Sequence, residues 1–273
     1  MPLPEMTERD AFFTPSKRYV VIKYGGHLME GGDTAFSKQI VSLYKQDILP
    51  IIVHGGGPEI TQMLTRLDIP SEFIDGLRKT TEESLEIIQM VLCGIINKRL
   101  ANSLTLEGAS AVGISGTDAS LIVAERMSHE LGFVGRPVDV NTAVLETILK
   151  GNVIPVIAPI SADLVGQSYN INADAVAAFI AGALQISLFI LTDVAGVRDA
   201  NGEIRDSLNE FLAQKFYDER IIKDGMYPKV QACLSALKLG AKEAFILDGR
   251  VPKNLHRFLI DNDHYIGTKI SLD

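Results

Sequence analysis

Residues 19–26 read YVVIKYGG and residues 50–57 read PIIVHGGG, so that in both places a short apolar stretch runs directly into glycines. Continuous apolar stretches, in contrast to alternating ones, are typical of strands that are covered on both faces, as in parallel sheets. Four further stretches of this kind occupy residues 110–114, 153–157, 188–192 and 244–248. Together with residues 19–24 and 50–53 they predict a buried, mainly parallel sheet.

Helical patterns lie between these predicted strands. Thr80 and Glu83 have the spacing of a capping box at the start of an amphipathic helix. Asn172 stands where it can cap a helix over residues 173–184, and a further helix is expected over residues 229–239. This alternation indicates an α/β fold, with an open, mainly parallel sheet sandwiched between helices in three αβα layers.

Two stretches break the alternation of strands and helices. Residues 121–141 alternate apolar and polar side chains around a polar turn near residues 128–130, which predicts a β-hairpin that could lie over a site. Residues 197–205 contain Asn201 followed by Gly202, a strong signal for a second, short hairpin.

The chain has 273 residues, a length that suits one large α/β domain or two fused lobes. We expect one compact domain with an N-terminal lobe over residues 18–160 and a C-terminal lobe over residues 161–273. Residues 1–17 contain three prolines that interrupt any long helix, so we expect a flexible leader there.

Composition excludes several classes of protein. The net charge of -8 disfavours a surface for nucleic acid or for an anionic membrane, and no stretch is apolar enough to span a bilayer. Residues 1–17 carry acidic side chains and resemble neither a secretory signal nor a transit peptide. Cys93 and Cys233 lie in apolar, helix-like stretches, which indicates core thiols in a cytoplasmic protein.

The ends of the predicted strands are the first place to look for a site, because open parallel sheets bind ligands beyond the carboxyl ends of their strands. Lys23 closes the first strand, where it is either an edge lysine that reaches water or a functional cation. The glycines after both strands either form tight turns or direct N–H groups at an anion. No Gly-Lys-Ser/Thr follows them, and Ile60 stands where a dinucleotide fingerprint needs glycine, so neither a P-loop nor a nicotinamide site is expected.

Other polar residues lie near predicted helix starts and strand ends. Residues 169–174 read YNINAD, and such residues either cap a helix or bind a ligand. Lys229 near a helix start suggests a nearby anion, because a cation there is mildly unfavourable. Asp193 and Arg78 complete this polar set, and we expect His54 to have a packing role in preference to that of a base.

Taken together, six motifs resemble those of the acetylglutamate kinases, a group within the amino-acid kinase family. They are KYGG at 23–26, HGGGP at 54–58, GLRKT at 76–80, YNINAD at 169–174, LTDVAGV at 191–197 and GMYPK at 225–229. The resemblance extends from about residue 18 to the end of the chain. It implies ATP-dependent phosphorylation, with Mg²⁺, of the γ-carboxylate of N-acetyl-L-glutamate to N-acetyl-L-glutamyl 5-phosphate, the second step of arginine biosynthesis.

The resemblance also implies roles for individual residues. Lys23 and Lys229 would flank the transferring phosphoryl group, and Asp174 would hold both lysines in place. The phosphates would meet the N–H groups of Gly25, Gly26, Gly55 and Gly56. The acyl amino acid would be bound by Gly56, Gly57, Arg78, Asn170 and Asn172. The nucleotide site would include Thr192, Asp193, Arg198 and Lys223. No protein ligand set for a metal is expected, because phosphate oxygens would hold the Mg²⁺.

Two other functions and one assembly question stay open at this point. The same lysines would serve a related carboxylate kinase that acts on an N-acylated aminoadipate. A catalytically silent regulatory relative is disfavoured, because Lys23, Asp174 and Lys229 are all present. Arginine-inhibited members of the family carry an N-terminal helix that links dimers into a hexamer. Residues 1–17 are short and rich in proline, so we expect a homodimer with weak or no inhibition by arginine.

Overall fold

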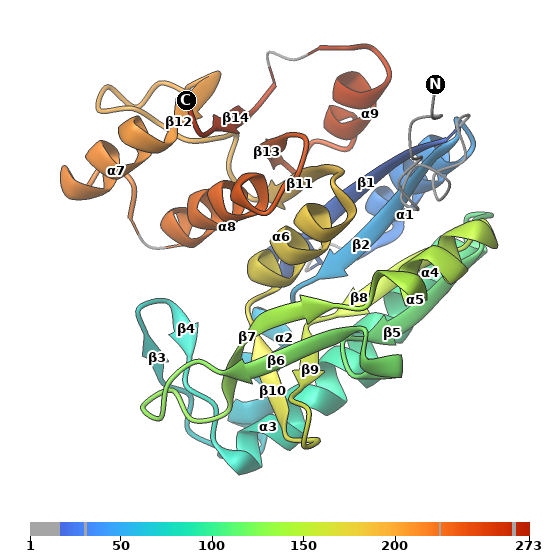
Figure 1. The fold of residues 1–273 in the computed structure, drawn as a ribbon, viewed down its shortest axis with the longest axis vertical. Helices are drawn as coiled ribbons and strands as arrows, with labels where there is room; N and C mark the ends of the chain where they lie inside the picture. The colour runs from blue at the N-terminus through green and yellow to red at the C-terminus, as the bar shows by residue number, and fades with distance from the viewer. Residues whose placement is uncertain (1–16, 30–31, 224, 264–265) are drawn as a thin grey trace, which may run out of the picture.

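The computed structural model describes residues 17–29, 32–223, 225–263 and 266–273. The expected leader therefore lies outside the described residues, except for Lys17. The central element is an eight-stranded sheet in the order β12-β14-β13-β11-β1-β2-β8-β5 (Figure 1), whose only antiparallel pair among these strands is β13 with β14. Its strands are β1 (Arg18–Tyr24), β2 (Ile48–His54), β5 (Ala111–Ser115), β8 (Ile154–Ala158), β11 (Ser187–Thr192), β12 (Ser207–Asn209), β13 (Ala244–Asp248) and β14 (Thr268–Ser271).

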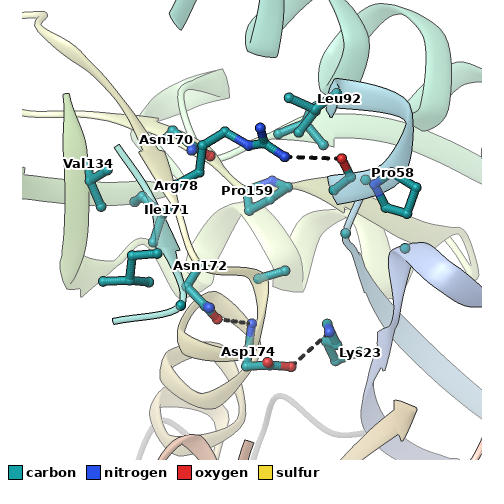
Figure 2. A pocket seen from close by; sticks show the side chains of 18 of the residues that line it. Lys23, Pro58, Arg78, Leu92, Val134, Pro159, Asn170, Ile171, Asn172 and Asp174 are labelled. Atoms are coloured by element: carbon teal, nitrogen blue, oxygen red, sulfur yellow. Dashed lines mark hydrogen bonds and ion pairs between the residues drawn. The ribbon is translucent and has the colours of Figure 1, made fainter. Parts of the chain in front are cut away.

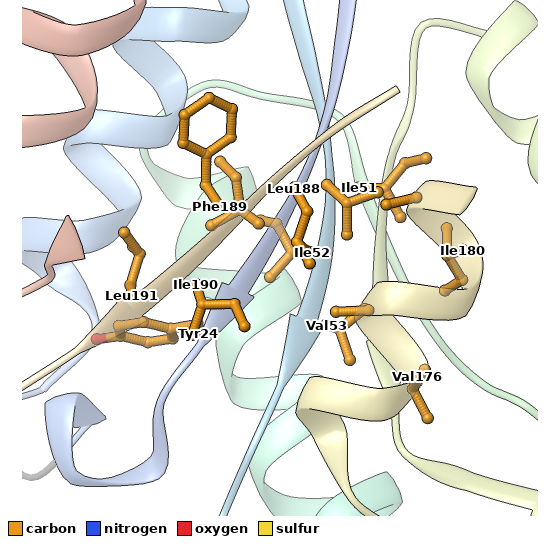
Figure 3. Packing of buried hydrophobic residues seen from close by; sticks show 14 of the residues in the cluster. Tyr24, Ile51, Ile52, Val53, Val176, Ile180, Leu188, Phe189, Ile190 and Leu191 are labelled. Carbon is orange, nitrogen blue, oxygen red and sulfur yellow. The ribbon is translucent and has the colours of Figure 1, made fainter. Parts of the chain in front are cut away.

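All six strands expected from their apolar stretches are present, with ends that differ by at most a few residues. The central strands β1, β2 and β11 are buried on both faces, as continuous apolar sequence predicts. The helix α6 (Ala173–Leu184) packs on β1 and β2, and its Val176 and Ile180 are fully buried, as are Ile51 and Val53 of β2 (Figure 3). On β11, Phe189 stacks on Phe245 with a centroid separation of 5.2 Å.

Helices cover both faces of the sheet, which confirms the expected three αβα layers. The helices α1 (Thr34–Tyr44), α4 (Asn97–Leu106) and α9 (Asn254–Leu259) pack on one face, and α5 (Thr142–Lys150), α6 and α8 (Met226–Lys238) pack on the other. The remaining helices are α2 (Gly57–Arg66), α3 (Glu82–Gln89) and α7 (Glu210–Asp218), with short 3₁₀ turns η1 (Gly26–Met29) and η3 (Asp118–Ser120).

A long helix runs from α3 through η2 (Met90–Ile96) into α4 without a break. The residues at both junctions, Met90 and Asn97, keep right-handed helical dihedrals. The η2 segment is wound as a π-helix, a form that is rare and often found beside functional sites. Leu92 and Ile96 of this segment pack against the loop at Gly56, which places the unusual turn directly under one of the glycine motifs.

A second, smaller unit of strands lies at the lower end of the molecule in Figure 1. The expected hairpin is present as β6 (Ile122–Arg126) and β7 (Val134–Val140), and with β9 (Ile160–Ala162) and β10 (Ser168–Ile171) it closes into a four-stranded barrel. A two-stranded arm, β3 (Phe73–Ile74) and β4 (Leu77–Arg78), projects beside it. The division into lobes at residue 160 stays a prediction.

Three local expectations need correction or adjustment. The capping box is formed by Thr81 and Ser84, not by Thr80 and Glu83: Thr81 Oγ1 accepts from the Ser84 N–H and Ser84 Oγ accepts from the Thr81 N–H. Thr80 is held elsewhere by tertiary hydrogen bonds, which moves the start of the helix by one residue. Residues 197–205 form only a single bridge, and α8 begins at Met226, three residues before the expected start. Asn172 caps α6 as expected.

In the part of the chain that the structure describes, no helix is long and apolar enough to cross a membrane.

Candidate active site

The carboxyl ends of four parallel strands meet at one edge of the sheet. In the register of these strands Tyr24 lies opposite both His54 and Leu191, and Thr192 lies opposite Asp248. The loops that follow β1, β2, β11 and β13 therefore emerge side by side. This edge is where open α/β sheets bind ligands.

A cavity of about 280 Å³ opens at this edge between the sheet and the small barrel (Figure 2). It collects all of the predicted catalytic and acceptor-binding residues, together with two glycines of the predicted phosphate loops, although they come from distant parts of the sequence. Those that line it are Lys23, Gly26, Gly55, Gly56, Gly57, Arg78, Asn170, Asn172, Asp174 and Lys229. The apolar part of the wall includes Leu92, Val134 and Pro159, which lie outside the six sequence motifs, and Ile171 of the YNINAD motif.

Two lysines converge on one buried carboxylate at the floor of this cavity. Lys23 Nζ lies 3.0 Å from Asp174 Oδ1, and Lys229 Nζ lies 3.7 Å from Asp174 Oδ2. The side chain of Asp174 is only 6% exposed, so its negative charge is stabilised by these two lysines and not by water. The three residues come from β1, α6 and α8, and they form one charged cluster with a net positive charge.

The electrostatics of the cluster differ between its members. Burial acts to raise the pKa of Asp174, but the two lysine charges outweigh it and hold the pKa below its ordinary value. Burial lowers the pKa of Lys229, and the nearby Lys23 lowers it further, while Asp174 and Asp193 oppose the shift. Asp174 is therefore ionised at neutral pH, as a residue that orients two ammonium groups must be.

Local sequence explains why these side chains are held so firmly. Asn172 Oδ1 accepts from the backbone N–H groups of Asp174 and Ala175, at 2.8 and 3.3 Å, and this cap fixes the first turn of α6. Asp174 in that turn also faces the positive end of the helix dipole. Lys229 lies in the first turn of α8, where its Nζ donates to the carbonyl of Gly225 at 3.1 Å.

The two glycine loops touch one another beside the lysines. A β-carbon at Gly26 would lie 3.0 Å from the backbone nitrogens of Gly56 and Gly57, and one at Gly56 would lie 2.4 Å from Cδ1 of Ile96. Side chains at these positions would separate the loops and crowd their N–H groups. The glycines thus allow two stretches of backbone to present donors to the same region.

Arg78 lines the cavity away from the lysine cluster, and its side chain is held by several contacts. Its Nη2 donates to the carbonyl of Gly57 at 3.2 Å and to Oγ1 of Thr61 at 2.7 Å, its Nη1 donates to Ser71, and its guanidinium lies 4.6 Å from the ring centroid of Phe73. These contacts orient the side chain, although Arg78 comes from the short β4 strand of the arm. A guanidinium so placed brings a positive charge to the cavity and can bind a carboxylate there.

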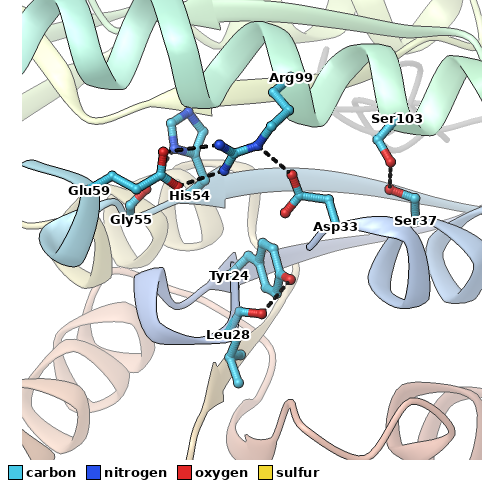
Figure 4. Close-up of polar contacts among 9 residues, drawn as sticks. All are labelled: Tyr24, Leu28, Asp33, Ser37, His54, Gly55, Glu59, Arg99 and Ser103. Carbon is cyan, nitrogen blue, oxygen red and sulfur yellow. Dashed lines mark hydrogen bonds and ion pairs between the residues drawn. The ribbon is translucent and has the colours of Figure 1, made fainter. Parts of the chain in front are cut away.

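Sequence reasoning missed a further arginine that supports the glycine loops (Figure 4). Arg99 of α4 makes two hydrogen bonds to the carboxylate of Glu59, at 2.7 and 3.0 Å, and its Nε lies 2.9 Å from Asp33 Oδ2. Asp33 and Glu59 stand at the starts of α1 and α2, the helices that follow the two glycine loops. Nothing in the spacing of residues 33, 59 and 99 indicates this contact.

The residues expected at the nucleotide lie outside the cavity. Thr192 is buried at the end of β11 and donates from Oγ1 to Asp193 at 3.1 Å, whereas Asp193, Arg198 and Lys223 are exposed. Asp193 lies near enough to Lys229 to oppose the lowering of its pKa, which connects this open side to the lysine cluster. Gly25 is buried beneath the first loop and does not line the cavity. Among the described residues no group of three His, Cys, Asp or Glu side chains is placed to hold a metal ion.

Comparison with known proteins agrees with this geometry. Residues 18–248 match the amino acid kinase family. The chain belongs to the amino acid kinase family. Within that family it is 47% identical to the acetylglutamate kinase of Gluconobacter oxydans (strain 621H), over 85% of this chain and 84% of the relative. It is 41% identical to the acetylglutamate kinase of Methylobacterium nodulans (strain LMG 21967 / CNCM I-2342 / ORS 2060), over 98% of this chain and 91% of the relative.

A solved structure in the same comparison supports the fold. The crystal structure of smu.665 from Streptococcus mutans UA159 superposes with a TM-score of 0.81 at 27% identity, over 93% of this chain and 99% of the other. These findings confirm the resemblance that the six motifs carried. They also confirm the α/β fold expected for a member of the amino acid kinase family.

In this amino acid kinase family member, His54 is built into the core beneath the glycine loop. It is fully buried and does not line the cavity; its Nδ1 lies 2.9 Å from the carbonyl of Gly55, and Asn97 donates to its Nε2 at 3.1 Å. Nδ1 therefore carries the proton of the neutral ring. Burial lowers the pKa of His54 to about 4, so the ring stays neutral at physiological pH. This geometry agrees with the expected packing role.

The buried His54 predicts a specific loss of stability in acid. Because the unfolded chain takes up a proton near pH 6.5 and the folded chain only near pH 4, lowering the pH through this window favours unfolding by about 3 kcal/mol in total. His54→Gln should flatten the dependence of the urea midpoint on pH between 7 and 4.5. Replacement of the exposed His129 by Gln is the matched control, and equal slopes in the two variants would contradict the assignment.

Proposed function

We propose that the protein transfers the γ-phosphoryl group of ATP to the γ-carboxylate of N-acetyl-L-glutamate, giving N-acetyl-L-glutamyl 5-phosphate and ADP in the second step of arginine biosynthesis. The observation that carries this proposal is the Lys23–Asp174–Lys229 cluster, which lies at the junction of the glycine loops and the cavity that contains Arg78. The names of the related acetylglutamate kinases support the choice of acceptor.

The charges around the cavity suit a doubly negative acceptor. Lys23, Lys229 and Arg78 contribute three positive charges and Asp174 one negative charge, which leaves a net charge of +2 among these cavity residues. N-acetyl-L-glutamate has two carboxylates and an uncharged nitrogen, so it matches this field better than an amino acid that carries an ammonium group. Arg78 would clamp the α-carboxylate, and Asn170 and Asn172 would bind the polar groups between the two carboxylates.

The transfer itself needs no general base, because a carboxylate with a pKa of about 4.3 is already ionised at neutral pH. One γ-carboxylate oxygen attacks the γ-phosphorus, the bond from this phosphorus to the bridging oxygen breaks, and ADP leaves with the electron pair. Negative charge then spreads over the transferring group. Lys23 and Lys229 would lie on either side of it, and Asp174 would keep both ammonium groups in position before the substrates arrive.

The nucleotide would approach from the open side of the sheet edge, where Thr192, Asp193, Arg198 and Lys223 lie. Its phosphates would meet the N–H groups of the glycine loops. Mg²⁺ would enter with the nucleotide, held by phosphate oxygens, which fits the engagement of Asp174 by two lysines. In this arrangement the lobe over residues 18–160, together with Asn170 and Asn172, binds the acceptor, and the rest of the lobe over residues 161–273 binds the nucleotide. The unpaired Cys93 and Cys233 support a location in the reducing cytoplasm.

The assay that tests this function traps the acyl phosphate with hydroxylamine in the presence of MgATP. We expect a strong hydroxamate signal with N-acetyl-L-glutamate and little with L-glutamate or N-acetyl-L-aminoadipate. A signal with N-acetyl-L-aminoadipate alone would keep the transfer chemistry and move the protein to a related acceptor. Absence of signal with all three, from folded protein that binds ATP, would refute a kinase function.

The buried cluster predicts large effects on turnover. Lys23→Ala and Asp174→Ala should each lower kcat by at least about a hundredfold, because each removes a preorganised charge contact of the transition state. Asp174→Asn, which keeps the shape and removes the charge, should show a similar loss. The exposed Lys242→Ala serves as the control with unchanged kcat. Near-normal turnover in well-folded Lys23 or Asp174 variants would rule out these roles.

We also propose that the protein is a homodimer. Exposed apolar side chains along the long α3–η2–α4 helix support an interface there: Met90 is 60% exposed, Ile95 44% and Leu106 79%. Light scattering should give twice the mass of the chain, and Met90→Asp combined with Ile95→Asp should give the monomer. A hexamer, or an unchanged mass in the double variant, would contradict this proposal.

A further inference from the structure

Thr80 is a fully buried residue at the meeting point of three elements that surround the acceptor cavity. Its backbone N–H donates to the carbonyl of Leu131 at 3.0 Å, and its carbonyl accepts from the N–H of Phe133 at 2.7 Å. Both partners belong to the loop between β6 and β7. The main chain of Thr80 is thus fixed to the barrel, and the position of its side chain is fixed with it.

The hydroxyl of Thr80 makes two further contacts, each to a residue of the cavity wall. Oγ1 donates to the carbonyl of Arg78 at 2.9 Å, and it accepts from Nδ2 of Asn170 at 3.2 Å. A threonine hydroxyl has a single proton, and here that proton is committed to Arg78. Towards Asn170, therefore, Oγ1 can act only as an acceptor.

This commitment determines which way the amide of Asn170 is turned. With its Nδ2 towards Thr80, the amide makes a hydrogen bond; turned by half a rotation, it would set two acceptor oxygens against each other. The backbone of Asn170 is also held, because its N–H donates to the carbonyl of Phe133 at 2.9 Å. The amide oxygen of Asn170 is consequently the atom turned away from Thr80, in a residue that lines the cavity.

We propose that Thr80 is a positioning residue that turns the amide oxygen of Asn170 towards the acceptor, where it accepts the N–H of the acyl-amide group. This inference rests on the proposed function, because it assigns a contact to that acceptor. An Asn170 oxygen turned this way makes the site selective for a hydrogen-bond donor at this position of the ligand. An ester oxygen in place of the amide N–H would leave the Asn170 oxygen unpaired and facing another acceptor.

The test compares N-acetyl-L-glutamate with its ester analogue, (S)-2-acetoxyglutarate, which replaces N–H by O and keeps both carboxylates. Dissociation constants for both ligands are measured by calorimetry with the full chain. The wild-type protein should bind the amide at least about tenfold more tightly than the ester, as expected for loss of one buried hydrogen bond. A ratio near one in the wild type would overturn the proposal without any variant.

Variants of Thr80 separate orientation from simple packing. In Thr80→Val and in Thr80→Ala, the Asn170 amide is released to turn its N–H groups to an ester, so the amide-to-ester ratio should fall to within about threefold. Thr80→Ser keeps the hydroxyl and should keep the wild-type ratio. The dissociation constant of ATP should be unchanged in all three. A Thr80 that only packs would lower affinity for both ligands equally, and an unchanged ratio in Thr80→Val and Thr80→Ala would overturn the proposal.

A double-mutant cycle shows whether the effect passes through Asn170. Asn170→Ala should abolish the preference for the amide, and adding Thr80→Val to it should change the ratio no further. A further change in the double variant would mean that Thr80 acts by another route, against the proposal. Failure of the proposed function would be visible separately, as absence of acyl phosphate from N-acetyl-L-glutamate in the hydroxylamine assay.

Discussion

Asp174 carries a charge that folding has removed from water, and the rest of the site depends on how that charge is compensated. A buried carboxylate without partners is too costly to remain ionised. Here the partners come from β1 and α8, on either side of α6, so the ion pairs hold three elements from distant parts of the chain at fixed separations. The same contacts that make the burial tolerable leave two ammonium groups side by side, ready for an anion. Stability and chemistry therefore depend on the same three side chains.

The glycine loops add a constraint of shape to this constraint of charge. Gly26 and Gly56 touch through their backbones, and the π-wound segment of the long helix presses Leu92 and Ile96 against the second loop from below. Arg99 then fixes the two helices that follow the loops. The loops are therefore held between the long helix and the ion pairs of Arg99. Their N–H groups are in position before a ligand binds.

Most of the fold could be predicted from sequence because the signals are local, whereas the residues of the site followed from the six motifs that resemble those of the family. Continuous apolar stretches marked the sheet strands, and Asn172 marked the start of α6. The features that could not be predicted from sequence depend on contacts between residues far apart in the chain. Thr81, not Thr80, caps α3 because the barrel loop holds Thr80 by its main chain. Arg99 joins residues some forty and sixty-six positions away, and the orientation of the Asn170 amide follows from a proton that only the folded structure assigns.

The arrangement of the site along the chain and across the sheet has a consequence for the evolution of such a protein. β1 lies at the centre, with β2, β8 and β5 on one side and β11, β13, β14 and β12 on the other. The residues proposed to read the acceptor fall between residues 56 and 172, whereas Lys23, Asp174 and Lys229 lie outside that stretch. Mutations confined to one uninterrupted part of the gene can therefore exchange the acceptor while the three charged residues at the transferring phosphoryl group are inherited intact. A fold arranged in this way is suited to give rise to kinases that share a reaction and differ in what they phosphorylate.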